Sequence, residues 1–288
     1  MQKILIIGEH SYIGGSFVEW MKQWSDLYKI DVVSSRENKW KEVYFGDYDS
    51  ILHVAGIAHV DAKADMEELY YKVNRDLTIA CCKKAKEDGA KQFIFLSSLI
   101  VYGESKSFEP VVITKDTKPV PNGFYGRSKL EAEEGIFSLE AEDFKVAAIR
   151  PPMVYGKHSK GNYPKLAKLA AICPIFPDIK NERSMIHIEQ LCECIRLVIE
   201  KQANGIFMPQ NKEYVSTTQL VQEIAKVKGK KVYTTKLFNP LIRVMAKKIS
   251  FINKVFGTLV YAKECSDCFD WNYCIYSFEE TIERTEKE

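Results

Sequence analysis

Three side chains in the middle of the chain, Ser98, Tyr125 and Lys129, are of the types that carry out proton transfer. Tyr125 and Lys129 are four residues apart, so in a helix both would lie on one face, one turn apart. A tyrosine has a pKa of about 10 and is a poor base at neutral pH, but a neighbouring ammonium favours the phenolate. Ser98 follows the strand-like run 92–96, so its hydroxyl can project from that strand's end toward the helix. The alternative is an ordinary helix with a half-buried tyrosine and a solvated lysine. A dinucleotide-binding signature elsewhere would favour the acid–base interpretation.

The N-terminus carries such a signature. Residues 3–8 form a short apolar run that ends at Gly8, as in a buried parallel strand, and an amphipathic helix follows. The turn between them has the spacing Gly8-x-x-Ser11-x-x-Gly14, with Ser11 where a middle glycine is usual. In a strand–turn–helix of this kind, the free N–H groups of the helix bind a pyrophosphate. A plain tight turn is the alternative.

The end of the second expected strand, 30–34, bears on the choice of dinucleotide. An acidic residue there would hold the ribose of NAD, but the chain has Ser34-Ser35-Arg36. Arg36 could pair with a 2′-phosphate, which favours NADP, or could be a surface arginine. The sequence therefore leaves NAD or NADP open. The interval 36–48 is too short for a helix and a strand, which predicts an abbreviated crossover.

Strand and helix patterns alternate along the first half of the chain, with helices expected at 66–87 and from Tyr125 to about residue 141. This alternation predicts an α/β fold with a Rossmann-type doubly wound parallel sheet. We place an NAD(P)-binding domain at 1–156 and a smaller, mixed substrate-binding domain at 157–288, with segment 183–208 returning to the first domain. The interval 157–181, which has three prolines, is expected to be loop-rich. Residues 216–219 are expected to cap a helix that runs to Lys228.

The composition and charge of the chain argue against several classes of function. The net charge is +2, from 41 basic and 39 acidic residues, so no overall field favours nucleic acid or an anionic membrane. The apolar region 237–261 is interrupted by basic residues, which argues against a spanning helix. The chain has eight cysteines and no secretory signal, which is typical of a soluble cytoplasmic protein with reduced thiols. Cys265, Cys268 and Cys274 include a Cys-x-x-Cys, but no fourth ligand is evident, and we expect no metal.

Together these segments resemble the extended short-chain dehydrogenase/reductase family, the NAD-dependent epimerases and dehydratases of nucleotide sugars. The resemblance spans nearly the whole chain. It rests on the glycine turn, His53-Val54-Ala55-Gly56, Asn74, Ser97-Ser98 before Val101-Tyr102-Gly103, Tyr125 with Lys129, and Arg150-Pro151-x-x-Val154-Tyr155-Gly156.

The resemblance implies a role for each matching residue. Tyr125 would be the acid/base, Lys129 would hold the nicotinamide ribose and lower the pKa of Tyr125, and Ser98 would hydrogen-bond the C4 oxygen of the sugar. The implied cofactor-binding residues are Gly8, Ser11, Tyr12, Ile13, Gly14, Arg36, Val54, Ala55, Gly56, Asn74, Tyr125, Lys129 and Pro152. The implied substrate-binding residues are Ser98, Tyr125, Met153, Asn162 and Arg183, with Arg183 on a nucleotide diphosphate.

Two departures from the family pattern concern the contacts to the sugar and the type of reaction. Met153 stands where many relatives carry a substrate-contacting Asn, which leaves the contacts to the sugar open. Ser98 is followed by Leu99-Ile100, whereas sugar 4,6-dehydratases have an acidic residue after the hydroxyl residue, which argues against dehydration.

We therefore expect redox chemistry at C4 of a UDP-sugar. The first choice is a UDP-glucose or UDP-N-acetylhexosamine 4-epimerase in polysaccharide or cell-surface sugar synthesis. The alternative is an NADPH-dependent UDP-4-keto-6-deoxy-hexosamine reductase, followed by a non-catalytic dinucleotide-sensing protein. The resemblance also implies a homodimer, which would pair through the helices that contain Tyr125 and Asn74.

Overall fold

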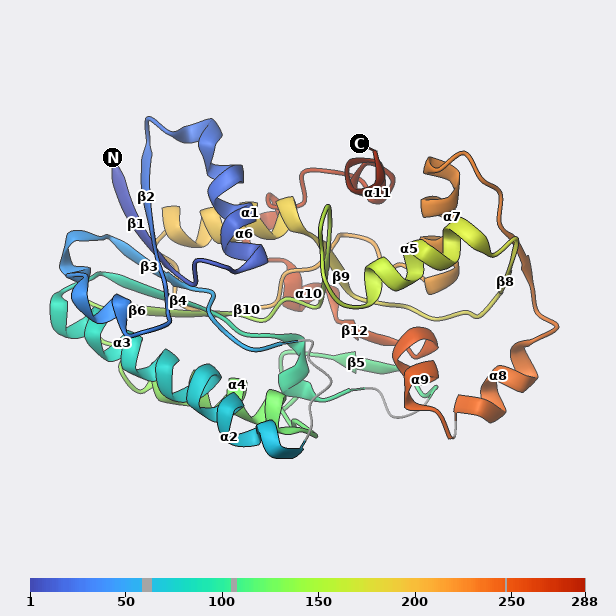
Figure 1. The fold of residues 1–288 in the computed structure, drawn as a ribbon, viewed down its shortest axis with the longest axis horizontal. Helices are drawn as coiled ribbons and strands as arrows, with labels where there is room; N and C mark the ends of the chain where they lie inside the picture. Colours follow the sequence, from blue (N-terminus) through green and yellow to red (C-terminus); the bar gives the residue numbers. More distant parts are fainter. Residues whose placement is uncertain (59–63, 105–107, 247, 288) are drawn as a thin grey trace. The chain divides into compact units, whose positions relative to one another are not determined.

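The computed structural model describes residues 1–58, 64–104, 108–246 and 248–287 (Figure 1). The chain forms two compact units. Unit 1 consists of Met1–Gly103, Pro119–Pro151 and Leu191–Pro209, and unit 2 consists of Glu104–Lys118, Pro152–Gln190 and Gln210–Glu288. The sequence places a domain boundary after residue 156, and the two units divide between residues 151 and 152. The segment that returns to unit 1 is 191–209. Unit 2 also includes residues 104–118 from the first half of the chain.

Unit 1 is built on a sheet of six parallel strands in the order β10-β6-β4-β3-β1-β2. These are β1 (Gln2–Ile7), β2 (Tyr28–Val33), β3 (Ser50–His53), β4 (Gln92–Leu96), β6 (Lys145–Ile149) and β10 (Gly205–Phe207). The inner strands are buried over almost their whole length, because helices cover both faces of such a sheet. This confirms the predicted Rossmann-type doubly wound fold.

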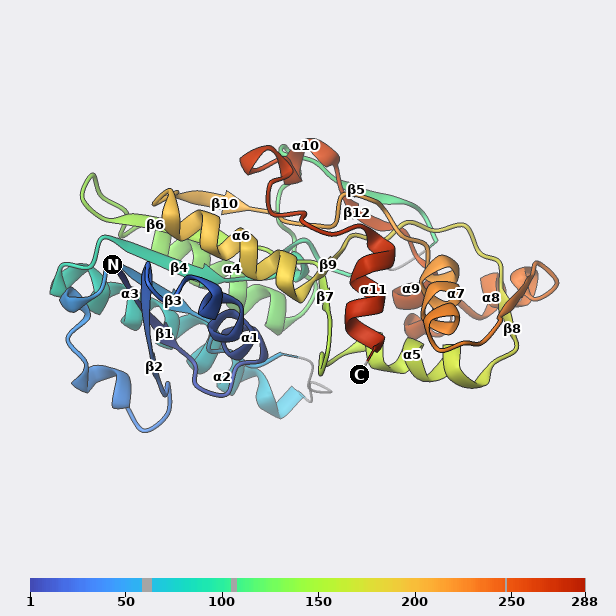
Figure 2. The same cartoon turned by 90° about the horizontal axis from the view of Figure 1, so that it is seen from above.

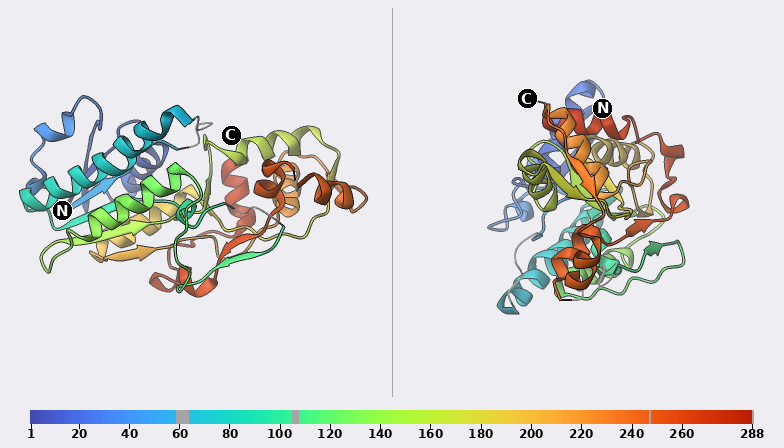
Figure 3. Two further views of the ribbon diagram at one scale, coloured as in Figure 1. Left: turned by 90° about the horizontal axis from the view of Figure 1, so that it is seen from below. Right: turned by 90° about the vertical axis from the view of Figure 1, so that its right-hand side faces the viewer.

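The helices of unit 1 are α1 (Tyr12–Met21), α2 (Glu67–Tyr70), α3 (Leu77–Asp88), α4 (Phe124–Phe137) and α6 (Ile188–Glu200). Helices α1 and α6 lie on one face of the sheet and α3 and α4 on the other, as Figure 2 and Figure 3 show from opposite sides. Cys81, Cys82 and Ile136 from α3 and α4 pack on Phe93 and Phe95 of β4. Trp20 on α1 donates a hydrogen bond to Glu193 on α6 at 3.1 Å.

The predicted helix 66–87 is interrupted. Between α2 and α3 the residues Tyr71–Asp76 form a π-helical segment, which contains the fully buried Asn74. Such segments are rare and frequently occur at functional sites. The predicted abbreviated crossover is confirmed, because residues 36–48 contain only the 3₁₀ turns Lys39–Glu42 and Phe45–Asp47.

Unit 2 contains three pairs of short parallel strands and six helices within the described residues. The strand pairs are β5 (Val111–Ile113) with β12 (Leu259–Tyr261), β7 (Met153–Tyr155) with β9 (Met185–His187), and β8 (Ile175–Pro177) with β11 (Tyr233–Thr235). The helices are α5 (Asn162–Ile172), α7 (Thr217–Val227), α8 (Asn239–Ala246), α9 (Ser250–Phe256), α10 (Lys263–Ser266) and α11 (Phe278–Glu286). Ser216 and Gln219 form the capping box of α7, as the sequence predicts.

The prediction of a loop-rich interval 157–181 is wrong, because α5 lies within it. Pro164 falls in the first turn of that helix, where a backbone N–H is not needed, so it does not break the helix. Tyr163, Leu166, Ala167 and Ala170 repeat at helical spacing and are buried in the core of unit 2. Along the described residues, no helix combines the length and the apolar character needed to cross a bilayer.

We predict that Gly8→Ala destabilises the protein by about 1–3 kcal/mol. Gly8 has φ +130°, and a Cβ there would meet the backbone nitrogen of Ala55 at 2.9 Å. Gly15→Ala is the matched control, because a Cβ at Gly15 meets nothing within 4 Å, and alanine favours the interior of α1. Urea unfolding should therefore show opposite shifts for the two variants. Equal shifts would contradict the packing of this turn against the end of β3.

Candidate active site

The candidate site in unit 1 begins where β4 ends. Ser97, the first residue after β4, is buried, and its hydroxyl donates to the carboxylate of Glu133. Ser98 is partly exposed and caps the short helical turn Leu99–Tyr102, with its Oγ accepting from the N–H of Ile100 at 3.3 Å. The carboxyl end of a strand in such a sheet is where ligands bind. The strand therefore presents the hydroxyl of Ser98 at the edge where chemistry is expected.

Helix α4 brings Tyr125 and Lys129 to the same place. Both side chains lie on one face of the helix, as predicted, and the hydroxyl of Ser98 is close enough to the phenol of Tyr125 to influence its pKa. The Tyr125 ring also contacts Tyr70 edge-on, with centroids 5.8 Å apart. Lys129 is buried, and its Nζ donates to the carbonyl of Leu96 at 2.9 Å. The structure thus brings Ser98, Tyr125 and Lys129 together.

Burial dominates the electrostatics of these two groups. Desolvation of the phenol raises the pKa of Tyr125 to about 12, although the hydrogen bond from Ser98 acts in the opposite direction. Desolvation lowers the pKa of Lys129 to about 7, and the charge of Glu133 partly counteracts it. The expected lowering of the Tyr125 pKa is therefore not seen in this structure, because burial outweighs the hydrogen bond from Ser98. Burial and the charge of Lys129 also lower the pKa of the buried His53 to about 3, which keeps that imidazole neutral.

Glu133 is a residue that the sequence analysis missed. It lies one turn beyond Lys129 on the same face of α4, and Arg150, at the end of β6, donates to it through both Nε and Nη2. Arg150 also donates to the hydroxyl of Tyr102 at 2.6 Å. This buried ion pair fixes α4 against the ends of β4 and β6. The i, i+4, i+8 spacing of Tyr125, Lys129 and Glu133 was a signal that could have identified it.

Asn74 joins the loop after β3 to α4. Its Oδ1 accepts from the N–H of Ile57 at 2.8 Å, and its Nδ2 donates to the Ile57 carbonyl and to Ser128, both at 3.2 Å. Gly56 lies between Asn74 and Lys129, and a Cβ there would meet Asn74 Oδ1 and Lys129 Nζ at 3.1 Å each. Because Gly56 has no side chain, the backbone at this position can pass close to Lys129.

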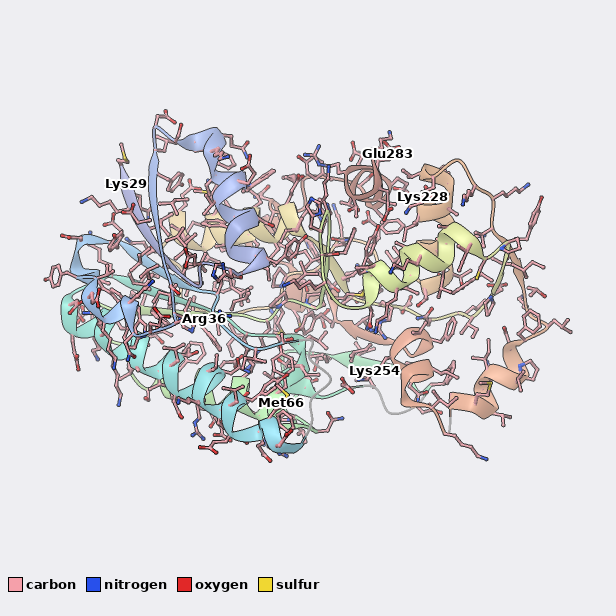
Figure 4. All side chains as sticks on the ribbon, in the orientation of Figure 1. Lys29, Arg36, Met66, Lys228, Lys254 and Glu283 are labelled. Atoms are coloured by element: carbon pink, nitrogen blue, oxygen red, sulfur yellow. The ribbon has the colours of Figure 1, made fainter. Side chains whose placement is uncertain are left out.

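The glycine turn fits a dinucleotide phosphate cradle. Ser11 caps α1, with its Oγ accepting from the N–H of Gly14 at 3.2 Å. A Cβ at Gly14 would lie 3.0 Å from the side chain of Val54, and one at Gly8 would strike Ala55, so both positions need glycine for the turn to approach β3. Tyr12 and Ile13 open α1, where helix N–H groups and the helix dipole favour an anion. Arg36 is exposed on the loop that follows β2 (Figure 4).

Unit 2 brings the other expected residues together. Met153 on β7, Asn162 at the start of α5, and Arg183 line one pocket. Arg183 is held by backbone hydrogen bonds with Val215, and its Nη1 donates to the carbonyl of Gly257 at 3.3 Å. Burial lowers the pKa of Arg183, and in the described part of the chain no acidic side chain pairs with it. A partly buried cation without a counter-ion favours an anionic ligand. Pro152, which directly precedes β7, is buried.

The cysteines of the C-terminal region lie apart from this chemistry. Cys265 Sγ contacts the carbonyl of Ile113 at 3.6 Å, and Cys274 Sγ contacts that of Gln210 at 3.3 Å. Burial raises the pKa of Cys274 to about 12. Among the residues that the structure describes, no group of three His, Cys, Asp or Glu side chains could hold a metal ion.

We predict that the buried ammonium makes stability depend on pH. The pKa of Lys129 is about 7 in the folded chain, below its ordinary 10.5, so the unfolded chain binds more protons and stability rises with pH. From pH 7 to about 8.5, where cysteine thiols begin to titrate, the unfolding free energy of the wild type should rise relative to Lys129→Met by about 1–2 kcal/mol. Urea unfolding of both proteins at several pH values measures this difference. Parallel pH curves would contradict a buried, titrating Lys129.

Comparison with known proteins identifies the family. Residues 4–208 match the model of the NAD-dependent epimerase/dehydratase family. A UDP-glucose 4-epimerase from Vibrio cholerae is 30% identical over 90% of this chain and 86% of the relative. An N-acetyl-alpha-D-glucosaminyl-diphospho-ditrans,octacis-undecaprenol 4-epimerase from Escherichia coli O157:H7 is 24% identical over 88% of this chain and 81% of the relative.

Solved structures support the fold. A UDP-glucose 4-epimerase superposes with a TM-score of 0.77 at 17% identity, covering 99% of this chain and 96% of that chain. A dTDP-4-dehydrorhamnose reductase from Bacillus anthracis in complex with NADP gives 0.76 at 17% identity, covering 99% and 98%. The chain belongs to the NAD-dependent epimerase/dehydratase family and is an enzyme whose cofactor is a nicotinamide dinucleotide.

Proposed function

We propose that this enzyme inverts the configuration at C4 of a UDP-linked hexose or N-acetylhexosamine. The observation that carries the proposal is that Tyr125 and Lys129 lie one turn apart on one face of α4, with the Ser98 hydroxyl close enough to the phenol of Tyr125 to influence its pKa. The Vibrio cholerae relative, named as a UDP-glucose 4-epimerase, supports the same reaction. A non-catalytic sensor would have no need of this proton-transfer set.

In the proposed reaction the phenolate of Tyr125 takes the proton of the sugar 4-hydroxyl, and Ser98 holds the same oxygen. The dinucleotide, when bound, supplies the hydride acceptor and donor. Oxidation at C4 would give a 4-keto sugar. After this sugar turns in the site, reduction would occur on its other face, and Tyr125 would return the proton to the C4 oxygen. Lys129, buried beside Gly56, would hold the nicotinamide ribose and favour the phenolate.

Within unit 2, Arg183 would bind the diphosphate of the substrate. Arg183 is suited to this group, because a guanidinium binds two phosphate oxygens at once and no acidic partner occupies it among the described residues. Met153 and Asn162 line the same pocket and would contact the sugar or the group beyond the diphosphate.

One observation favours a second candidate, an NADPH-dependent reductase of a UDP-4-keto-6-deoxy-hexosamine. Arg36 is exposed after β2, where an NAD-binding acidic residue is absent, and it suits a 2′-phosphate. The nucleotide released on denaturing the purified protein separates the two candidates. Retained NAD supports the epimerase, since hydride must return within one turnover. An empty site that takes up NADPH supports the reductase.

We predict that Tyr125→Phe lowers the rate of C4 epimerisation of UDP-glucose or UDP-N-acetylglucosamine by about 10²–10⁴-fold, because the acid/base is lost. Chromatography of the two epimers measures the rate. Arg127→Gln is the matched control. Arg127 lies two residues after Tyr125 in α4 and is exposed, and among the described residues its side chain bonds to Tyr71 and Glu67. Full activity in Tyr125→Phe, with dinucleotide content unchanged, would disprove the catalytic assignment.

A further inference from the structure

Two consecutive residues at the end of β4 bind two side chains that lie one turn apart on α4. The carbonyl of Leu96 accepts a hydrogen bond from Lys129 Nζ at 2.9 Å. The next residue, Ser97, donates through its hydroxyl to the carboxylate of Glu133. An ammonium and a carboxylate are therefore both held at the end of the same strand. The residue that follows in the chain is Ser98, whose hydroxyl belongs to the proton-transfer set.

The carboxylate of Glu133 interacts with two cations. Arg150 donates to it through Nε at 3.0 and 3.1 Å and also through Nη2. Its charge also acts on Lys129, and the two residues are only 2% and 5% exposed. A buried ion pair can often be replaced by well-packed apolar side chains without loss of stability. Stability alone therefore gives no reason for a charged group at this position of α4.

The other groups that face Lys129 do not favour its charge. His53, at the end of β3, is a neutral imidazole, because burial and the charge of Lys129 lower its pKa to about 3. Tyr125, on the same helix, is a neutral phenol near pH 7, because burial raises its pKa to about 12. The guanidinium of Arg150, after β6, is itself a cation and is bound to Glu133. Among these groups, Glu133 supplies the negative charge that favours the ammonium.

The ammonium of Lys129 needs this support. Loss of water around it lowers its pKa to about 7, even though the charge of Glu133 acts in the opposite direction. Without the carboxylate, Lys129 would lose its proton in the neutral pH range. A neutral amine cannot favour the phenolate of Tyr125, so the state of Glu133 bears on the chemistry at the other end of this face of α4.

We propose that Glu133 is a positioning residue for the reaction, which acts through Lys129 by keeping its ammonium charged beside Tyr125. The carboxylate stays ionised, with Ser97 and Arg150 as its donors, and it neither gives nor takes a proton during the reaction. This inference rests on the proposed function, because the need for a charged lysine comes from the phenolate that takes the proton of the sugar hydroxyl.

Two variants separate the charge of Glu133 from its structural role. Glu133→Gln removes the charge and nearly keeps the shape of the side chain. Arg150→Lys is the matched control, because it disturbs the same contact between α4 and β6 but keeps both charges. The double variant Glu133→Gln/Arg150→Met provides a second test where Glu133→Gln does not fold. It also deprives Lys129 of the carboxylate, but it leaves no buried ion without a partner.

Urea unfolding at several pH values tests the charge directly on the purified protein. Each protein is compared with its own Lys129→Met counterpart, so that the difference reports Lys129. Since the pKa of Lys129 is lower in the folded chain than in the unfolded chain, stability rises with pH above the folded value. In Glu133→Gln and in the double variant this rise should begin about one pH unit lower than in the wild type. In Arg150→Lys it should begin at the same pH as in the wild type. No shift in Glu133→Gln or in the double variant, or an equal shift in Arg150→Lys, would overturn the proposal.

The pH dependence of C4 epimerisation tests the consequence for the reaction. Relative to the wild type, Glu133→Gln should be about tenfold slower at pH 8, where less of its Lys129 is charged, and should approach the wild-type rate below pH 6. A loss that is equal at every pH would indicate a structural role and overturn the inference, while the proposed function would stand. An unfolding shift in a wild type without epimerase activity would overturn the proposed function and leave the charge coupling of Glu133 and Lys129 standing.

Discussion

The geometry of the site depends on the buried ion pair between Glu133 and Arg150. One partner comes from α4, the helix of Tyr125 and Lys129, and the other from the end of β6. Ser97 at the end of β4 donates to the same carboxylate, so three elements meet on one acidic group. Removal of one partner from such a pair costs about 3–5 kcal/mol, because the other charge is left buried without compensation. The pair therefore sets the position of α4, which carries Tyr125 and Lys129, relative to the strand that precedes Ser98.

Burial also shifts the pKa values of Tyr125 and Lys129. The pKa of Tyr125 rises to about 12 and that of Lys129 falls to about 7, and both shifts have the same main cause, the loss of water around each group. In such an environment a charge that arrives beside these groups acts strongly, since little solvent screens it. The pKa values of Tyr125 and Lys129 are therefore sensitive to the charge of a bound ligand. A tyrosine that is a weak acid in the free enzyme can become a useful base when a positive charge lies near it.

Unit 2 places two kinds of group next to one another. Arg183, partly buried and without an acidic partner in the described residues, is suited to an anion, and a cavity of about 100 Å³ that adjoins its pocket is lined mainly by apolar side chains.

The sequence by itself determined the elements that depend on local spacing. Tyr125 and Lys129 meet because helix periodicity places residues four apart on one face, and the glycine turn follows from strand, small residues and helix in succession. The tertiary structure decided what depends on distant partners. Glu133 and Arg150 are 17 residues apart on different elements, and the π-helical segment around Asn74 coincides with its bonds to Ile57 and Ser128. The three prolines between residues 157 and 181 led to the prediction of a loop where α5 lies. That helix is stabilised by burial of one face in the core of unit 2. The exposure of Leu241 and Val244 on α8 was likewise set by the fold, because the same apolar residues could equally have lined a core.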